Sequence, residues 1–486
     1  MSLPIDLSLD IPPAELLGRV HFVGIGGAGM SGIARVFLAR GLPVSGSDAK
    51  DSRTITALRA EGARIAIGHD AVNIAAAHTV VVSSAVRATN PEVVAARERG
   101  LLVMHRSQAL VSLMQGRTRV AVAGTNGKTT TTSMLTVALQ RAGADPSFAI
   151  GGELTESGTN AHHGTGPTFV AEADESDGSF VLYRPHIAVV TNVQPDHLDH
   201  YGTAEAVEQA FLEFARGIPP DGVLVACADD DGSRRLAGAA ADLGIRVLTY
   251  GRSPDADVVV EPLETAGAGQ GGFALREPTA DPAVEPAVAK LLVPGWHNVL
   301  NAAAAYTAAT RGLGLDRVVV RGGLEQYTGT RRRFEPRGSA AGVRVVDDYA
   351  HNPGKVAAVL QTARSVAAGG RVVVVFQPHL FSRTRDFATD FGAALGAADE
   401  VVVMDVYAAR EDPVPGVTGA LVAAAVPLPA DHVAFVPSWS AVADEVVARL
   451  RPGDILLTVG AGDVTLLGPE ILARLESAAS ATRGAR

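Results

Sequence analysis

Short apolar runs alternate along the chain with longer stretches whose apolar positions recur every three or four residues. The first pattern predicts buried β-strands, and the second predicts helices that pack on a sheet. Strands are predicted at residues 19–23, 42–46, 64–67, 79–82 and 101–104, and helices at 30–40, 54–61 and 90–99. This alternation predicts a parallel, doubly wound sheet whose ligands bind at the carboxyl ends of its strands.

The same alternation returns twice further along the chain. A second group of strands is predicted at 119–123, 168–172, 187–193, 223–226 and 245–250, and a third at 344–346, 371–376, 400–406 and 454–459. Residues 267–272 are typical of a turn region and 281–286 of a Pro-rich peripheral segment. We predict an α/β protein with domains at 1–115, 116–327 and 328–486: Rossmann-like, P-loop ATPase with a mostly parallel sheet, and Rossmann-like.

A glycine-rich loop follows the first strand of the second domain. Its residues are Gly124, Thr125, Asn126 and Gly127, and Lys128, Thr129, Thr130 and a helical pattern from Met134 come next. A strand, glycine loop, lysine, hydroxyl and helix in this order indicate a phosphate site, where backbone N–H groups and the lysine face phosphates and a hydroxyl binds Mg²⁺. Val122 stands where the common pattern has glycine. The alternative is a turn with an incidental lysine, but the chain has only four lysines against 38 arginines.

A second glycine-rich loop lies at the start of the chain. Gly24, Gly26, Gly27, Ala28, Gly29 and Met30 follow the first strand, and Asp48 ends the next one. This pattern favours a nucleotide ligand of unspecified kind, and a tight strand–helix turn is the alternative. His69, Ser83, Ser84, His105 and Arg106 also follow strands, and only this position is predicted for them.

Two acidic segments of the second domain follow strands as well. Glu172 begins EADESD, and His197 lies within QPDHLDH. Clustered carboxylates beside a phosphate loop suit Mg²⁺, although a solvated loop or a turn with a capping Asp would explain either segment alone. Asn298 and Asn301, three residues apart near a predicted helix start, are amide caps or ligands. The third domain lacks a phosphate loop but places Asp, His and Arg at strand ends.

Composition excludes several classes of protein. A net charge of −10 gives no footprint for nucleic acid, and a single cysteine, Cys227, precludes a disulfide framework. The N-terminal segment lacks the basic start of a signal peptide, and no apolar run approaches the length that spans a bilayer. We expect a cytoplasmic monomer or homodimer without nucleic-acid partners or membrane insertion.

Separate sites for a nucleotide and for ATP favour phosphoryl transfer to a nucleotide-bearing substrate, or a ligation driven by ATP. Catalysis would then consist mostly of positioning and charge neutralisation. A Rossmann-type dehydrogenase explains Gly24, Gly26, Gly29 and Asp48 but leaves Lys128 unused. A non-catalytic nucleotide sensor has no need of the third domain's His and Arg residues.

The chain resembles the Mur ligase family from end to end. The resemblance rests, in order, on HFVGIGGAGMSGIA, GTNGKTTTTSM, EADESDGSF, TNVQPDHLDHYG, PGWHNVLNAAAA, GTRRRFE, VDDYAHNP, FQPHLFSRTRDF and VGAGD. It implies ATP-dependent ligation of L-alanine to the lactyl carboxylate of UDP-N-acetylmuramate through an acyl phosphate. It also implies Mg²⁺ or Mn²⁺ as the metal. The absence of lysine between Lys128 and Lys290 is similar to this branch, and the branch that attaches a tripeptide during muropeptide recycling shares it.

The resemblance also implies residue roles. ATP would contact residues 124–130 with His297, Asn298, Asn301, Arg333 and Asp348, and metal would contact Thr129, Glu172 and His197. The UDP-sugar would contact Gly26, Gly27, Ala28, Gly29, Met30, Asp48, His69, Ser83, Ser84 and Arg106. The amino acid would contact Tyr349, His351, His379 and Arg383. Lys128, Glu172, His197, Arg333 and His351 would be catalytic.

The chain departs from the family pattern within three motifs. Asn126 replaces the histidine of GTHGKT, Asn352 replaces the second histidine of YGHHPTE, and Leu380 stands where FQPHRYTRTR has its first arginine. These departures concern the amino-acid site more than the ATP site.

Overall fold

The computed structural model describes residues 5–263, 272–278, 285–409 and 411–484. The predicted turn region at 267–272 and Pro-rich segment at 281–286 therefore lie largely outside the described residues. The chain forms two compact units. Unit 1 contains the described residues up to 292 together with 298–328, and unit 2 contains 293–297 and the described residues from 329 onward.

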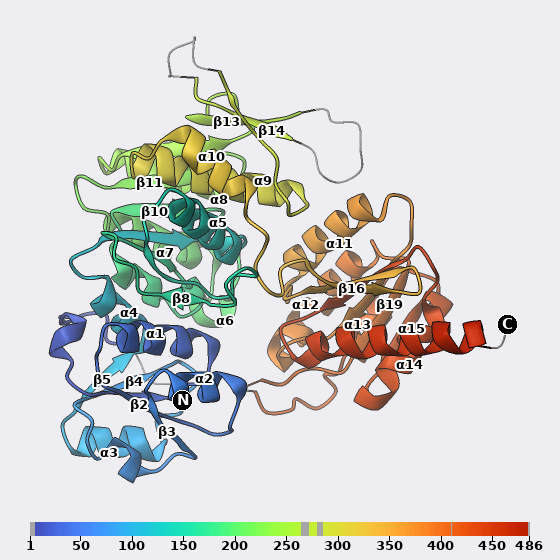
Figure 1. Cartoon of the computed structure of the whole chain (residues 1–486), viewed down its shortest axis with the longest axis horizontal. Coiled ribbons are helices and arrows are strands. Elements are labelled where there is room, and N and C mark those ends of the chain that lie inside the picture. Colours follow the sequence, from blue (N-terminus) through green and yellow to red (C-terminus); the bar gives the residue numbers. More distant parts are fainter. Residues whose placement is uncertain (1–4, 264–271, 279–284, 410, 485–486) are drawn as a thin grey trace. The chain divides into compact units, whose positions relative to one another are not determined.

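The first sheet of unit 1 is five-stranded and parallel throughout, in the order β3-β2-β1-β4-β5 (Figure 1). Its strands are β1 (Val20–Val23), β2 (Val44–Asp48), β3 (Arg64–Ile67), β4 (Thr79–Val82) and β5 (Leu102–His105). Its helices are α1 (Ala28–Ala39), α2 (Arg53–Ala60), α3 (Pro91–Glu98) and α4 (Arg106–Met114). Strands β2 and β3 are added on one side of β1, and β4 and β5 on the other. The switch point between β1 and β4 is where such sheets bind ligands.

The second sheet of unit 1 has ten strands, in the order β15-β14-β13-β12-β11-β10-β6-β9-β7-β8. Its parallel strands are β6 (Thr118–Ala123), β7 (Ser147–Ala149), β9 (Thr168–Glu172), β10 (Ile187–Val190), β11 (Val223–Cys227), β12 (Val247–Gly251) and β13 (Val258–Pro262). The edges are antiparallel through β8 (Ala161–His162), β14 (Phe273–Arg276) and β15 (Ala287–Ala289). The three antiparallel edge strands were not predicted, and neither were β7 and β13.

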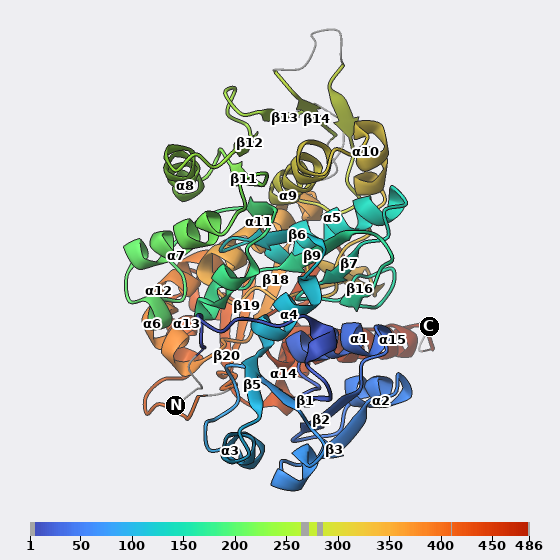
Figure 2. The ribbon, with the colours of Figure 1, turned by 90° about the vertical axis from the view of Figure 1, so that its left-hand side faces the viewer.

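Helix α5 (Lys128–Arg141) packs on β6 and β9 at the centre of this sheet (Figure 2). It begins six residues before the predicted start at Met134, because the threonine run is helical and largely buried. The Thr132 hydroxyl donates to the carbonyl of Lys128, which satisfies a polar group inside the helix. The other helices of the sheet are α6 (Leu198–Tyr201), α7 (Ala204–Arg216), α8 (Asp231–Asp242), α9 (Trp296–Thr307) and α10 (Arg317–Glu325).

Unit 2 contains a six-stranded sheet in the order β16-β17-β21-β18-β19-β20. Its strands are β16 (Glu335–Ala340), β17 (Val343–Asp348), β18 (Val372–Phe376), β19 (Glu400–Met404), β20 (Val433–Val436) and β21 (Ile455–Val459), and only β16 pairs antiparallel. Its helices are α11 (Pro353–Ala367), α12 (Phe381–Leu395), α13 (Ala420–Ala425), α14 (Trp439–Arg449) and α15 (Leu467–Gly484). One apolar core lies under α11 to α13 and another under α14 and α15.

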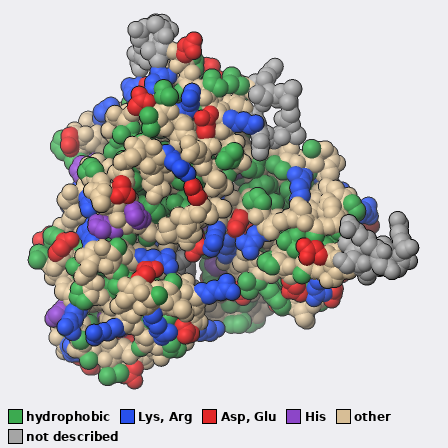
Figure 3. Space-filling model, in the orientation of Figure 1, with side chains coloured by type: hydrophobic (Ala, Val, Ile, Leu, Met, Phe, Trp, Pro, Cys, Tyr) green, Lys and Arg blue, Asp and Glu red, His purple; other side chains and the backbone are tan. Residues whose placement is uncertain are grey.

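The predicted fold class is confirmed, because three mostly parallel sheets are covered by helices. The domain boundaries at 115/116 and 327/328 stay a prediction. Basic and acidic side chains are interspersed on the face seen in Figure 3. Among the described residues, none of the helices combines the length and apolar character that crossing a membrane requires.

Candidate active site

The loop between β6 and α5 depends on two glycines with positive φ, Gly124 at 129° and Gly127 at 86°. A Cβ atom at Gly124 would lie 2.1 Å from the Thr191 hydroxyl, and one at Gly127 would lie 2.5 Å from Oδ1 of Asn301. Other residues would therefore be strained in backbone and in packing at both positions. The loop and the N-terminus of α5 form a backbone cradle of the kind that holds phosphates.

The segment after β10 braces this loop. The N–H of Asn126 donates to Oδ1 of Asn192 at 2.8 Å, and the Thr125 hydroxyl donates to the carbonyl of Gln194 at 3.1 Å. The Asn126 amide also reaches Oε1 of Gln194 at 3.2 Å. Its Oδ1 is buried and has no hydrogen-bond partner within the described part of the chain. Asn126, which departs from the family pattern, therefore connects the loop to the segment after β10 and leaves one acceptor oxygen for a ligand.

Lys128 is paired inside the protein. Its Nζ lies 2.7 Å from Oε1 of Glu175 and 2.7 Å from the carbonyl of Gly124. Burial lowers the pKa of Lys128, but the carboxylates of Glu175 and Asp174 outweigh burial and raise it, so the side chain is a cation. Glu175 is only 2% exposed. The sequence placed Glu175 in the acidic segment suited to Mg²⁺ but did not predict it as the partner of Lys128.

The predicted metal ligands Thr129 and Glu172 lie together, with Oγ1 of Thr129 2.9 Å from Oε1 of Glu172. The other carboxylate oxygen accepts from the N–H of Gly151 at 2.6 Å. His197 lies instead beside Glu175, with 3.8 Å between Nε2 and Oε1. No cluster of three or more His, Cys, Asp or Glu side chains suited to a metal occurs among the described residues. One hydroxyl and one carboxylate fit Mg²⁺, which takes its remaining ligands from phosphates and water.

The predicted amide ligands lie at the start of α9. Asn301 donates to Oδ1 of Asn298 at 3.3 Å and faces Gly127 of the phosphate loop. Both amides are buried, whereas His297 is exposed in the first turn. Thr130 lies half-buried in the first turn of α5. The structure therefore brings Asn301 against the phosphate loop of unit 1.

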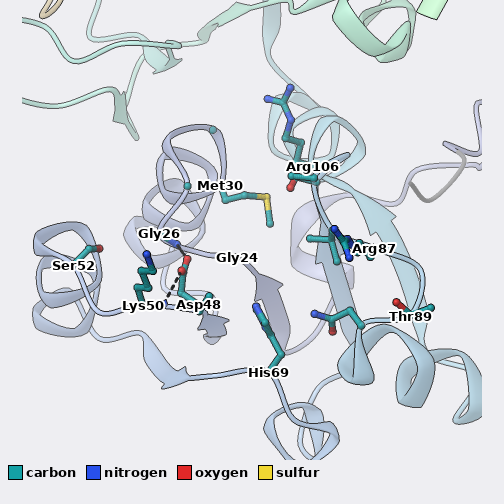
Figure 4. A pocket seen from close by; sticks show the side chains of 17 residues that line it. Gly24, Gly26, Met30, Asp48, Lys50, Ser52, His69, Arg87, Thr89 and Arg106 are labelled. Atoms are coloured by element: carbon teal, nitrogen blue, oxygen red, sulfur yellow. Dashed lines mark hydrogen bonds between the residues drawn. The ribbon is translucent and has the colours of Figure 1, made fainter. Parts of the chain in front are cut away.

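A cavity of about 750 Å³ opens at the switch point of the first sheet (Figure 4). Eight of the ten residues predicted to bind the UDP-sugar line it: Gly26, Gly27, Gly29, Met30, Asp48, His69, Ser83 and Arg106. The side chain of Ala28 is not described, and Ser84 is absent from the lining. Lys50, Ser52, Arg87, Thr89 and Asn90 also line the cavity and were not predicted. Three basic side chains make the cavity suitable for an anion.

Asp48 braces the glycine loop at this cavity. Its Oδ2 accepts from the N–H of Gly26 at 2.9 Å, and its Oδ1 accepts from the N–H of Lys50 at 3.4 Å. A Cβ atom at Gly29 would lie 2.9 Å from Nη1 of Arg106, so glycine permits that guanidinium to approach the loop. In Figure 4, Asp48 and Lys50 lie on one side of the cavity, Arg106 and Arg87 on the other, and His69 between them.

Two side chains predicted to bind the UDP-sugar contact the second sheet's acidic segment. Arg106 forms an ion pair with Asp174 at 2.8 Å, and Ser84 donates to Asp177 at 2.7 Å. His105 lies 3.5 Å from the same Asp177 carboxylate. The EADESD segment therefore joins the two sheets of unit 1, in addition to presenting Glu172 and Glu175 to the phosphate loop.

The predicted amino-acid residues gather at strand ends in unit 2. The rings of His351 and His379 are 6.1 Å apart, and Nδ1 of His351 lies 2.9 Å from the carbonyl of Tyr349. The Tyr407 ring stacks beside His379 at 5.9 Å and was not predicted. Burial lowers the pKa of His351 well below its usual value, and the charges of Lys355 and Arg383 add to this. His351 is therefore a neutral imidazole.

The arginine run of unit 2 surrounds the same strand end. Arg332 and Phe334 both have positive φ, 59° and 48°, so Arg333 sits in a strained turn. The guanidinium of Arg333 lies 5.2 Å from the centre of the Tyr349 ring. Asp348 accepts from the N–H groups of Phe334 and Ala350, each at 2.7 Å. Burial raises the pKa of Asp348 to about 6, although Arg333 and these hydrogen bonds oppose it.

Leu380, one of the departures from the family pattern, precedes α12 with a φ of 70°. Its side chain is buried. Asn352 caps α11, with its Oδ1 accepting from the N–H of Lys355 at 2.8 Å. Asn352 therefore serves the start of its helix, whereas the side chain of Leu380 makes no capping hydrogen bond to α12.

The sequence matches three family models in the order of these sheets. Residues 19–118 match the catalytic domain of the Mur ligase family, residues 122–309 the Mur ligase middle domain, and residues 332–462 the glutamate ligase domain. UDP-N-acetylmuramate--L-alanine ligase from Kineococcus radiotolerans is 62% identical over 460 residues, which cover 94% of this chain and 96% of that protein. The enzyme of the same name from Acidothermus cellulolyticus is 57% identical over 95% of each chain.

Solved structures agree with these sequence matches. The crystal structure of UDP-N-acetylmuramate-alanine ligase MurC from Thermotoga maritima is 30% identical, covers 95% of this chain and 99% of its own, and has a TM-score of 0.78. A murein peptide ligase from Psychrobacter arcticus shares the fold, at 24% identity and a TM-score of 0.70. These matches leave the dehydrogenase and sensor hypotheses without support. The chain belongs to the Mur ligase family.

Proposed function

We propose that the protein joins L-alanine to the lactyl carboxylate of UDP-N-acetylmuramate in peptidoglycan precursor synthesis, with ATP converted to ADP and phosphate. The observation that carries this proposal is the 53–62% identity to UDP-N-acetylmuramate--L-alanine ligases over nearly the whole chain. The phosphate loop and the basic cavity in unit 1 support it, because the reaction needs one site for ATP and one for a UDP-sugar. The reaction would take place in the cytoplasm, in a monomer or homodimer.

The phosphate loop is the proposed ATP site. Bound ATP would supply the γ-phosphoryl group, and Mg²⁺ held by Thr129 and Glu172 would neutralise phosphate charge. Lys128 would exchange Glu175 for the outer phosphates, while Gly124 and Gly127 keep the backbone N–H groups close to them. Asn126 and Asn301 border the same loop and would position the nucleotide. Catalysis would rest on these donors and charges, because the phosphoryl donor and the acceptor carboxylate are both anions.

The cavity at the first sheet is the proposed UDP-sugar site. Lys50, Arg87 and Arg106 would bind its diphosphate, and the main chain at Gly26 and Gly27 would approach it closely. Arg106 also contacts Asp174, three residues before Asp177 and two after Glu172. The proposed UDP-sugar and ATP sites therefore both contact one acidic segment. This segment would place the lactyl carboxylate of the bound UDP-sugar next to the phosphate loop.

The strand ends of unit 2 are the proposed amino-acid site. The carbonyl of Tyr349 holds Nδ1 of His351 as a donor, so Nε2 of this neutral ring can accept a proton. This atom would take the proton that L-alanine's amine loses when it attacks the acyl phosphate. His379 and Arg383 would bind the amino acid's carboxylate, and Arg333 and Asp348 would reach ATP.

Phosphate release from the full chain tests the proposal. Turnover should require ATP, UDP-N-acetylmuramate and L-alanine together, and the purified product should carry alanine by mass spectrometry. The amino-acid panel is L-alanine, glycine, L-serine and the tripeptide of muropeptide recycling. A preference for the tripeptide would overturn the proposed substrate, and turnover without UDP-N-acetylmuramate would overturn the acceptor.

A further inference from the structure

A buried carboxylate lies beneath the UDP-sugar cavity. Glu92, at the N-terminus of α3, is 0% exposed. Its Oε2 accepts from the Ser47 hydroxyl at 2.6 Å, and its Oε1 accepts from the Asn73 amide at 2.6 Å. Nδ1 of His69 lies 3.2 Å from Oε2, and Nε2 of His21 lies 3.7 Å from Oε1. A buried carboxylate is costly unless donors surround it, and these four groups surround Glu92.

Glu92 is an acceptor at both oxygens. Burial raises the pKa of this carboxyl, but the nearby His21 ring and the hydrogen bonds from Ser47 and Asn73 outweigh burial and hold the pKa at about 2. The group is therefore ionised at neutral pH. An ionised carboxylate has no proton to donate, so each of its neighbours must donate to it.

This arrangement determines which nitrogen of His69 carries the proton. Nδ1 of His69 lies 3.2 Å from Oε2 of Glu92 and 3.0 Å from Oγ of Ser47. The single hydroxyl hydrogen of Ser47 is used toward Glu92, so Ser47 can only accept from the ring. Both neighbours of Nδ1 are acceptors, and Nδ1 must carry the hydrogen. In a neutral imidazole, Nε2 then has a lone pair.

Nε2 is the nitrogen left for a ligand. His69 lines the cavity, and Figure 4 shows its ring between the two basic walls. Within the described residues no protein partner of Nε2 is found, whereas Nδ1 has two. Lys50, Arg87 and Arg106 already supply positive charge to the cavity.

We propose that Glu92 is a positioning residue that makes His69 a hydrogen-bond acceptor in the cavity. His69 then selects a ligand group that donates, either the N–H of a uracil base or a ribose hydroxyl. The inference rests on the proposed function, because a uridine nucleotide is the expected ligand. A site that accepts a hydrogen bond discriminates strongly against analogues that lack the donor.

Glu92→Gln should reverse the role of His69. The Asn73 amide also donates to the carbonyl of Gly68 at 3.2 Å, so Asn73 cannot turn without losing that bond. The Ser47 hydroxyl can rotate. The new glutamine should therefore keep its oxygen toward Asn73 and present its NH₂ group to Ser47 and His69. That NH₂ group donates to Nδ1, so the ring proton moves to Nε2, which becomes a donor.

The experiment combines two measurements on the full chain. The ¹⁵N chemical shifts of His69, assigned with His69→Asn, should show a protonated Nδ1 and an unprotonated Nε2 in the unchanged protein. Calorimetry should show UDP binding about 10- to 100-fold weaker in Glu92→Gln, since a donor would face a donor. Glu61→Gln makes the same chemical change at an exposed ion pair with Arg35 and should leave UDP binding unchanged.

Two nucleotide analogues identify the donor. If the base N–H is read, Glu92→Gln should lose its discrimination between UDP and CDP. If a hydroxyl is read, 2′-deoxyuridine diphosphate should bind the unchanged protein as weakly as UDP binds Glu92→Gln. Either result supports the inference. In the His69→Asn background, Glu92→Gln should have no further effect on UDP affinity.

Three results would overturn the inference. The first is an Nε2 proton on His69 in the unchanged protein, which is readable even where Glu92→Gln does not fold. The second is UDP affinity in folded Glu92→Gln equal to that of the unchanged protein. The third is an undiminished effect of Glu92→Gln in the His69→Asn background. Failure of the unchanged protein to bind UDP is a separate outcome, because it would overturn the proposed function.

Discussion

The two glycine loops of unit 1 have the same layout, but the basic side chains beside them have different partners. Both follow a central parallel strand and lead into a helix, yet their charged groups are satisfied in different ways. At the phosphate loop, Lys128 and Thr129 are bound to Glu175 and Glu172. At the other loop, Asp48 binds backbone N–H groups, and Lys50 and Arg87 line an open cavity.

The difference shows how each loop should meet an anion. At the cavity, Lys50 and Arg87 need only lose water when a diphosphate binds, whereas Arg106 is already paired with Asp174. The phosphate loop must exchange an internal ion pair for an external one, so its net gain is smaller for each contact. Equal substitutions at Lys128 and Lys50 should therefore differ in which kinetic constant they change.

Lys128→Ala should have the largest effect, lowering kcat by roughly 10³-fold, because the reacting phosphates lose a preorganised cation. Lys50→Ala should leave kcat nearly unchanged and raise the KM for UDP-N-acetylmuramate by up to about tenfold, as lost ground-state binding does. Steady-state phosphate release measures both. The comparison fails if Lys128→Ala changes only a KM, or if Lys50→Ala lowers kcat as much as Lys128→Ala does.

Glu172→Gln should raise the Mg²⁺ concentration for half-maximal turnover by roughly 10- to 100-fold, because one of two oxygen ligands from the protein loses its charge. Magnesium titrations at saturating ATP measure this change. Glu156→Gln, at an exposed ion pair with Arg141, is the matched control and should behave as the unchanged protein. An unchanged magnesium requirement in Glu172→Gln would remove this residue from the metal site.

Asp348 of unit 2 should have the smallest effect, which is measured as stability and not as turnover. Its pKa is raised to about 6, so the folded state holds a proton that the unfolded state releases near pH 4. Protonation of Asp348 therefore stabilises the folded state fully below the unfolded pKa of about 4, and this stability is lost as pH rises through about 6. The unfolding free energy of unit 2 should fall by about 1 kcal/mol between pH 5 and pH 6.5, and less so in Asp348→Asn. Urea unfolding at both pH values measures it, and equal slopes in both proteins would contradict the assignment.

Sequence patterns predicted most of the parallel strands, though not β7, β13 or β20, because apolar periodicity and strand-end position are local properties. They predicted the Thr129–Glu172 pair and most of the cavity for the same reason. Glu172 and Glu175 could not be told apart as partners of Lys128, since their side-chain directions depend on the turn at residues 175–177. Only the fold decides which carboxylate meets which cation.

Other misses have equally specific causes. Lys50 and Arg87 lie in loops without a periodic pattern, so nothing local indicates that they line the same cavity as Gly26. Ser84 was predicted to face the ligand, but its hydroxyl donates to Asp177, which is 93 residues away in the sequence. The antiparallel edge strands of the second sheet are short and follow few apolar alternations, which leaves helix, strand and loop equally compatible with their residues.

The Lys128–Glu175 pair has a consequence for competition among anions. An inorganic phosphate or sulfate ion that enters the loop must displace a buried carboxylate and offers few contacts in return. A nucleoside triphosphate offers many contacts at once, and Mg²⁺ can compensate the negative charge left on Glu175. Small anions should therefore bind the loop much less readily than a nucleoside triphosphate does.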